Sequence, residues 1–212
     1  MAGEQKRIPA RFYRTASGTE PVRVWLRSLD PPDRRTIGMD LKDVEYGWPV
    51  GMPLCRPLGH GLWEVRSSIS SGRIARVIFC VDHGEMVILH GFIKKTRKTP
   101  PGDIERPCNA SREGDGMRAE NIGSSLDEFL EEEGILEEAT ARAQKKALAW
   151  QLDQAMKQRG FTKTEMARRM RTSRAQLDRL LDPAHTTVKL ETMQRAAAIL
   201  GKSLRIELVD PA

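Results

Sequence analysis

Hydrophobic and polar positions follow two different rhythms along the chain. In the first half, apolar and polar residues alternate over short runs such as Leu62–Arg66 and Ile74–Phe79, and Met86–His90 is almost entirely apolar. This pattern predicts β-strands. In the second half, apolar residues recur every three or four positions, which predicts helices. The chain therefore divides into a β-rich part and a helical part.

The first part is expected to order its elements as a strand, two helices and then several strands. An edge strand is predicted over 8–15, and helices are predicted over about 19–29 and 33–46, where prolines separate two runs of helical spacing. The strands named above follow, and a further strand fits residues 54–58. This order predicts an α+β domain with two helices on a mostly antiparallel sheet.

A change in composition marks the boundary between the two parts. Residues 101–121 are rich in Pro, Gly, Ser and charge and lack apolar periodicity, which is typical of a linker. Within it, Gly116-Met117-Arg118 has the form of a former translation start read in frame. We therefore predict a first domain over 1–106, a linker over 107–121 and a second domain over 122–212.

The second domain is expected to be helical, with one strand at its C-terminal end. A long helix is predicted over 139–159 and ends at Gly160, a residue typical of helix C-termini. A later helix fits the apolar periodicity of residues 190–200. Alternation over 204–209 predicts the strand.

Two capping boxes stand between these helices. Thr162 is followed three residues later by Glu165, and Ser173 is followed at the same spacing by Gln176. Each box predicts the start of a short helix, and the two helices are separated by a tight turn. This arrangement predicts a helix-turn-helix.

The polar residues of this motif suit DNA. Arginine can pair with guanine and glutamine with adenine in the major groove. A serine and the free amides at a helix start suit a phosphate. The alternative is a helical hairpin whose polar face is only solvated. The candidate DNA-binding residues are Thr162, Thr164, Ser173, Arg174, Gln176 and Arg179.

Residues 121–210 resemble the HigA-type antitoxins of the XRE family. The resemblance rests on TKTEMARRMRTSRAQLDRLLDP followed by LETMQRAAAILGKSLRIELV. It implies a protein that binds its own operator DNA as a dimer, represses transcription and silences a toxin. We accordingly expect a homodimer or a higher homo-oligomer.

The first domain gathers cations on or just after its predicted strands. RNA cleavage by the 2′-OH needs its developing phosphate charge stabilised, which fixed cations can do without a metal. It also needs a proton acceptor and a proton donor, and a histidine can serve as either. His90 fits a core position equally well, and the basic run after it fits general affinity for ribosomal RNA. The candidate catalytic residues are Arg66, Arg73, Arg76, His90, Lys94 and Lys95.

Residues 8–100 resemble the RelE/HigB superfamily of toxins, and most closely the phage-derived HigB-like branch. The resemblance rests on GLWEVRSSISSGRIARVIF and MVILHGFIKKTRKTP. It implies a ribosome-dependent mRNA endoribonuclease, or mRNA interferase, acting on ribosome-bound mRNA, with Arg97 and Lys98 as RNA-binding residues. Members often carry a functional Tyr or His near the C-terminus of the domain, and no residue here matches it.

Charge is distributed in three blocks. Residues 1–106 hold 18 Lys/Arg and 12 Asp/Glu, residues 117–160 hold 6 and 9, and residues 161–212 hold 10 and 6. Two basic blocks flanking an acidic one suit a chain that touches nucleic acid twice and itself once. The acidic segment 126–138 is the candidate for contact with the basic patch of the toxin-like domain, and the alternative is a solvated helix face. Its candidate toxin-neutralising residues are Glu131, Glu132, Glu133, Glu137 and Glu138.

Other features narrow the class of protein. The three cysteines lie far apart with no histidine at ligand spacing, so we expect no disulfide framework, metal or cofactor. No apolar run is long enough for a membrane span and no signal peptide is recognisable, so a cytoplasmic protein is expected. The hypothesis is a toxin fused to its own antitoxin. The alternatives are a repressor with a catalytically dead toxin-like dimerisation domain, and an artificial fusion of a toxin–antitoxin pair.

Overall fold

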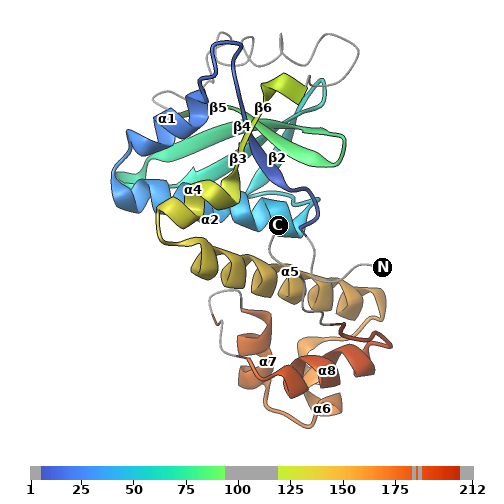
Figure 1. The fold of residues 1–212 in the computed structure, drawn as a ribbon. Coiled ribbons are helices and arrows are strands. Elements are labelled where there is room, and N and C mark those ends of the chain that lie inside the picture. The colour runs from blue at the N-terminus through green and yellow to red at the C-terminus, as the bar shows by residue number, and fades with distance from the viewer. Residues whose placement is uncertain (1–5, 94–118, 183–184, 186–187, 206–212) are drawn as a thin grey trace. The chain divides into compact units, whose positions relative to one another are not determined.

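The computed structural model describes residues 6–93, 119–182, 185 and 188–205 (Figure 1). This part of the chain forms two compact units, one of residues 6–140 and one beginning at residue 141. The predicted linker lies outside the described residues except for its last three. Those three form the short turn η2 (Ala119–Asn121). Within the described ranges, no helix is long and apolar enough to cross a bilayer.

The 6–140 unit is built on a six-stranded sheet with the order β2-β3-β4-β5-β1-β6. Every neighbouring pair is antiparallel except β1 and β5, which run parallel. This confirms the predicted α+β class with a mostly antiparallel sheet. The strands are β1 (Ala10–Tyr13), β2 (Cys55–Gly59), β3 (Leu62–Ser68), β4 (Ile74–Asp82), β5 (Glu85–Ile93) and β6 (Ile122–Ser125).

Strand β6 is the element that the sequence pattern did not predict. It lies beyond the predicted linker, yet it pairs antiparallel with β1, with Arg11 opposite Ser125 and Tyr13 opposite Ile122. An edge strand carries a row of unpaired backbone groups, and β6 pairs with that edge of β1. The start of the predicted second domain therefore belongs to the sheet of the first.

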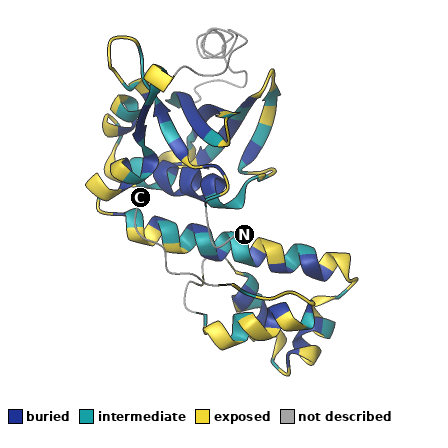
Figure 2. Cartoon of the chain, turned by 45° about the vertical axis from the view of Figure 1, so that its right-hand side comes forward, coloured by how far each residue is buried: buried dark blue, intermediate teal, exposed yellow. Residues whose placement is uncertain are grey.

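Three helices pack on one face of this sheet, namely α1 (Pro21–Arg27), α2 (Pro31–Gly47) and α4 (Leu126–Glu132). Helix α2 begins two residues earlier than predicted, because a proline is well tolerated in the first turn of a helix. Figure 2 shows α2 and the strands beneath it as largely buried. We call residues 122–140, which comprise β6, α4 and the first residues of α5, the docked segment.

The docked segment supplies part of the core of this unit. Leu126, Phe129 and Leu130 are fully buried in the same apolar cluster as Phe12 and Ile37. The rings of Phe12 and Phe129 meet edge to face with centroids 5.7 Å apart. A large aromatic side chain in such a position contributes both buried area and a favourable ring contact. The fold of the 6–140 unit is therefore completed by residues from the far side of the linker.

The opposite face of the sheet carries a smaller apolar cluster, which includes Leu62, Ile78 and Val87. Cys80 lies in it, and Cys55 lies in the larger one. Burial raises the pKa of Cys55 to about 12 and that of Cys80 to about 11. Both thiols are thus protonated near neutral pH, and they act as small apolar side chains.

The second unit is helical. Helix α5 (Leu136–Gln158) begins in the first unit and ends in the second, and three shorter helices follow it. Their apolar faces form one cluster that includes Met166, Leu177 and Ala196. The predicted C-terminal strand lies mostly outside the described residues, and its described residues, Leu204 and Arg205, are not in a strand. The shorter helices are α6 (Lys163–Arg169), α7 (Arg174–Leu181) and α8 (Leu190–Ile199).

Truncating Phe129 tests whether the docked segment is part of the core. We expect Phe129→Ala to lower the free energy of unfolding of the 6–140 unit by about 3–5 kcal/mol, because it leaves a cavity beside Phe12. Denaturant unfolding followed by tryptophan fluorescence measures this, since Trp25, Trp48 and Trp63 lie in that unit. The matched control is Val24→Ala, whose side chain is 58% exposed. Equal losses in the two variants would contradict the assignment.

Candidate nucleic-acid interfaces

The helix-turn-helix is set by its two N-terminal caps. The Thr162 hydroxyl accepts a hydrogen bond from the Glu165 N–H at 3.1 Å, and the Ser173 hydroxyl accepts one from the Gln176 N–H at 3.2 Å. These bonds satisfy amides that lack partners at a helix start. The two caps predicted from the sequence are confirmed, and they fix where α6 and α7 begin.

Glu165 does not complete its capping box. Its carboxylate accepts hydrogen bonds from Arg168 at 2.9 Å and from Arg169 at 2.7 Å. These bonds lower the pKa of Glu165 to about 2. The arginines are better partners than a backbone amide because the bond is charge-assisted at both ends.

The structure brings the predicted DNA-binding residues to the starts of α6 and α7 and along α7. Helix α7 buries Leu177 and Leu180 and leaves its other face open, as a recognition helix must. On that open face, Asp178 pairs with Lys163 at 2.8 Å, which ties the two helices together. All six predicted DNA-binding residues are exposed to solvent, namely Thr162, Thr164, Ser173, Arg174, Gln176 and Arg179.

Three of the six predicted catalytic residues of the first domain lie on the face of the sheet opposite the helices. Arg66 on β3 lies directly across from Arg76 on β4, and His90 on β5 lies across from Ile78. Direct cross-strand partners share a face, and residues two apart on a strand share it too. Arg66, Arg76 and His90 are therefore on one side of the sheet.

A buried glutamate organises this face. Glu64 is fully buried on β3 and accepts a hydrogen bond from Arg76 at 2.5 Å. Arg56 and Arg66 also lie near its carboxylate, at 3.3 and 3.6 Å. The sequence analysis missed Glu64, although its place two residues before Arg66 puts both on the same side of the strand. We call Glu64, Arg66, Arg76 and His90 the strand face.

The remaining first-domain candidates are placed differently. Arg73 is not on the strand face, since its guanidinium pairs at 2.5 Å with Asp33 of α2. His90 is half-buried, and its ring stacks on Phe92 with centroids 5.6 Å apart. The residues that lie outside the described part of the chain are Lys94, Lys95, Arg97 and Lys98.

The acidic segment contacts cations, but on the helices. Glu132 pairs with Arg23 at 2.6 Å and with Arg27 at 2.5 Å, both on α1. On α2, Glu133 pairs with Arg34 at 2.8 Å, and Glu138 pairs with Arg35. We expected the partners of this segment to be the strand-borne cations. Since α4 buries its apolar side against α2 and β1, its acidic side meets the arginines of α1 and α2 instead.

Two of the predicted neutralising residues stand apart. Glu131 and Glu137 are exposed, and neither takes part in an ion pair with any described residue. Conversely, Asp127 was not predicted, and it pairs with both Lys6 and the fully buried Lys42. Glu45 is also fully buried, and its carboxylate lies 2.6 Å from the ammonium group of Lys42 and helps to neutralise it.

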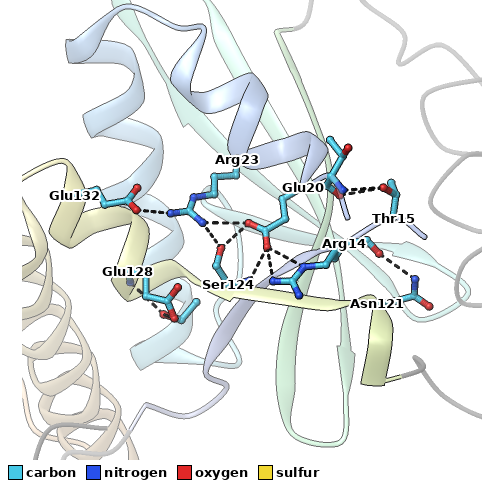
Figure 3. A network of polar contacts seen from close by, with 10 residues as sticks. Arg14, Thr15, Glu20, Arg23, Asn121, Ser124, Glu128 and Glu132 are labelled. Carbon is cyan, nitrogen blue, oxygen red and sulfur yellow. Dashed lines mark hydrogen bonds and ion pairs between the residues drawn. The ribbon is translucent and has the colours of Figure 1, made fainter. Parts of the chain in front are cut away.

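A polar network anchors β6 beside α1 (Figure 3). The Glu20 carboxylate accepts hydrogen bonds from the Ser124 N–H at 2.8 Å and from the Ser124 hydroxyl at 2.5 Å. Arg14 and Arg23 donate to the same carboxylate at 3.0 and 3.3 Å. Burial alone would raise the pKa of Glu20, but these bonds outweigh it and lower the pKa to about 2. Glu20 is thus ionised at any physiological pH.

Beside this network is an open hollow of about 440 Å³. It is lined by three arginines and one acid together with the turn that precedes α1, so its charge favours an anion. Among the described residues, no group of three or more His, Cys, Asp or Glu is arranged to hold a metal ion. The lining residues are Arg14, Gly18, Thr19, Glu20, Arg23, Val24 and Arg27.

Comparison with known protein families agrees with this division. Residues 24–108 match the family described as phage-derived protein Gp49-like, a toxin-like domain. Residues 151–204 match the Cro/C1-type helix-turn-helix DNA-binding domain. No curated protein matches the chain.

The chain therefore joins a segment similar to a toxin-like family to a segment similar to a DNA-binding family. More particularly, the first segment is similar to the Gp49-like family and the second to the Cro/C1-type, XRE helix-turn-helix domain, an order that matches a toxin-like domain followed by a helix-turn-helix antitoxin.

Glu20 gives a prediction about pH. Its folded-state pKa of about 2 lies below the ordinary value of 4.5, so its contribution to stability is present above pH 4.5 and is lost as the pH falls toward 2. We expect Glu20→Gln to cost about 2 kcal/mol at neutral pH. The difference in free energy of unfolding between this variant and the parent chain should decrease as the pH falls from 4.5 toward 2, as measured by urea unfolding. Glu85→Gln, which breaks a looser pair at 3.7 Å from Arg11, should cost much less at every pH.

The exposed face of α7 gives a prediction about DNA. We expect Arg174→Ala and Gln176→Ala each to weaken binding to the DNA upstream of the coding sequence by about 1–3 kcal/mol, because each would remove a predicted base contact. Fluorescence anisotropy with that DNA measures the change. Arg195→Ala is the matched control, since Arg195 is exposed on α8 and pairs with Glu191. A loss as large for Arg195 would show that α7 is not the reading element.

Proposed function

We propose that the chain is a toxin–antitoxin fusion whose N-terminal domain is a ribosome-dependent mRNA endoribonuclease, inhibited in cis. The C-terminal domain binds operator DNA and represses the operon that encodes the chain. One observation supports this above all. The segment that leads into the DNA-binding domain is docked on the toxin-like domain through a strand, a buried helix face and several ion pairs.

The proposed cleavage takes place at the strand face. The 2′-OH of the RNA attacks the adjacent phosphorus, the bond from phosphorus to the 5′-oxygen breaks, and a 2′,3′-cyclic phosphate forms. Arg66 stabilises the extra charge on the phosphate, and Glu64 holds the arginines in place. His90, with Lys94 or Lys95, takes the proton from the 2′-OH or returns one to the leaving oxygen. Arg76 acts as a supporting cation, and Arg97 and Lys98 bind the RNA, whereas Arg73 pairs with Asp33 away from this face.

Arg76 is a poor position for a variant that tests catalysis. It is only 3% exposed and pairs with the fully buried Glu64, so removing it leaves a buried carboxylate with one counter-charge fewer. Loss of activity in such a variant would report the fold as much as the chemistry. His90 is half-buried and is the better position to substitute.

Repression follows from the helix-turn-helix together with dimer formation. A dimer places two α7 helices about one DNA turn apart, which matches the two halves of a palindromic operator. In the intact chain, the acidic docked segment is tethered to the domain that it inhibits. Tethering gives a high effective concentration, so inhibition in cis should be nearly complete.

A second function is favoured by the depth of the docking. Leu126, Phe129 and Leu130 belong to the core of the toxin-like domain, so the docked segment is an integral part of its fold. Glu64 pairs with Arg66 and Arg76 and so reduces the positive charge of the strand face. A domain built in this way could serve a repressor as a catalytically dead dimerisation or co-repressor module. Release of the docked segment separates the two functions, because endoribonuclease activity should then appear if the first is right and stay absent if the second is right.

Gly123 provides a way to release β6 without touching the strand face. A Cβ at this position would lie 2.4 Å from a Glu20 carboxylate oxygen and 2.7 Å from the Phe12 carbonyl oxygen. We expect Gly123→Ala to loosen β6 and to cause growth arrest on induction in bacteria, whereas the parent chain does not. Adding His90→Gln should relieve the arrest. Gly51→Ala is the matched control, because a Cβ there meets nothing within 4 Å.

Hydrogen exchange makes the result interpretable. Faster exchange over residues 10–13 in the Gly123 variant would show that β1 has lost its partner strand. Arrest together with faster exchange supports the inhibited endoribonuclease. Faster exchange without arrest contradicts it and favours the repressor with a dead toxin-like domain.

A further inference from the structure

The arginines of the toxin-like domain fall into two groups according to where their acidic partners come from. Arg66 and Arg73 pair with Glu64 and Asp33, which lie within the toxin-like domain itself. A second group on α1 and α2 meets acids of the docked segment. We call this second group, Arg23, Arg27, Arg34 and Arg35, the helix-side arginines.

Most helix-side arginines depend on the docked segment for charge neutralisation. Within the described residues, the acidic partners of Arg27, Arg34 and Arg35 are all in the docked segment, while Arg23 also has Glu20. Without the docked segment, α1 and α2 would present at least three unpaired guanidinium groups. A cluster of this kind attracts a polyanion.

We propose that the helix-side arginines form an RNA-backbone binding surface, and that carboxylates of the docked segment occupy it in the intact chain. This inference rests on the proposed function, since it takes the partner to be RNA handled by the toxin-like domain. It places an RNA contact away from the strand face, on the opposite side of the sheet.

The geometry around Glu132 supports a phosphate as the natural occupant. One carboxylate oxygen of Glu132 lies 2.6 Å from Arg23 and the other lies 2.5 Å from Arg27. A phosphodiester offers two free oxygens in a similar arrangement, and guanidinium groups bind them in the same way. Arg23 and Arg27 also line the open hollow of about 440 Å³, where Arg14 adds a third cation. A neighbouring nucleotide has room there.

Two of these ion pairs are too exposed to contribute much to holding the docked segment in place. The side chains of Arg27 and Glu132 are 52% and 47% exposed, and those of Arg35 and Glu138 are 43% and 58% exposed. Exposed pairs contribute little to stability because water screens them. The apolar contacts of α4 and the strand pairing of β6 already anchor the docked segment. The carboxylates can therefore be exchanged for phosphates at little cost to the fold.

The docked segment contains its own matched control. Glu132→Gln with Glu138→Gln removes two acids that pair with helix-side arginines, and Glu131→Gln with Glu137→Gln removes two neighbouring acids that do not. Both double variants of the full chain change the net charge equally. Each is made with Arg174→Ala and Gln176→Ala, so that α7 does not contribute to RNA binding.

Binding of a short fluorescently labelled single-stranded RNA is measured by anisotropy over a range of salt concentrations. We expect the paired-acid variant to bind roughly tenfold more tightly at low salt, and its plot of log Kd against log salt to steepen by about 1.4 for two additional phosphates. The control variant should stay within about twofold of its parent, since Glu131 and Glu137 do not occupy a helix-side arginine. Adding Arg27→Ala and Arg35→Ala to the paired-acid variant should remove the gain.

Equal tightening in both double variants would mean that net charge alone drives binding, and it would overturn the proposal. No tightening in either would overturn it as well, provided that thermal melts show both variants folded. A labelled duplex DNA tested beside the RNA should show no comparable gain, and an equal gain would contradict the assignment to RNA. Growth arrest remains a separate measurement, so an inactive endoribonuclease with the expected RNA binding would disprove the proposed function and leave the surface standing.

Discussion

The burial of Phe129 and its neighbours against Phe12 is the contact on which the rest of the structure depends. It fixes α4 on the helix side of the sheet, and α4 in turn positions β6 on β1 and Asp127 beside Lys42. Apolar burial of this kind is the largest favourable term in folding. The ion pairs around it are consequences of that placement, because it brings Glu132 and Glu133 beside the arginines of α1 and α2.

The position of the docked segment also decides where inhibition can act. It lies on the β1 edge and the helix side, while the strand face with Glu64 and Arg66 is across the sheet. If the docked segment inhibits as proposed, it would do so by occupying a surface that the ribosome or its RNA needs, and not by filling the proposed cleavage site. The two sides of one sheet would thus divide binding and chemistry between them.

Much of the fold could be predicted from the sequence, and the failures have a common cause. Alternation located β3 and β4, an apolar run located β5, and the caps at Thr162 and Ser173 located α6 and α7, because these signals are local. Strand β6 has only four residues and no alternating pattern, so its pairing with β1 depends on tertiary contacts that no local signal encodes. The same holds for Ser124, whose partner Glu20 is 104 positions away.

The candidate site shows the same limit. Sequence reasoning found the cations of the strand face but not Glu64, whose role depends on being buried among them. It found the acidic segment but assigned it the wrong set of arginines, because charge blocks carry no information about which face a helix presents. Composition likewise placed the boundary at the linker, whereas contacts place it at residue 140, within α5.

The pairing of β6 with β1 has a consequence for the order of events during translation. A ribosome makes Arg11 more than 100 residues before it makes its partner Ser125. Until the docked segment has been synthesised, the edge of β1 and the apolar surface of α2 lack the residues that cover them in the finished structure. The sheet is therefore completed only after the docked segment has been synthesised, so the six-stranded sheet and its full apolar core never form without that segment.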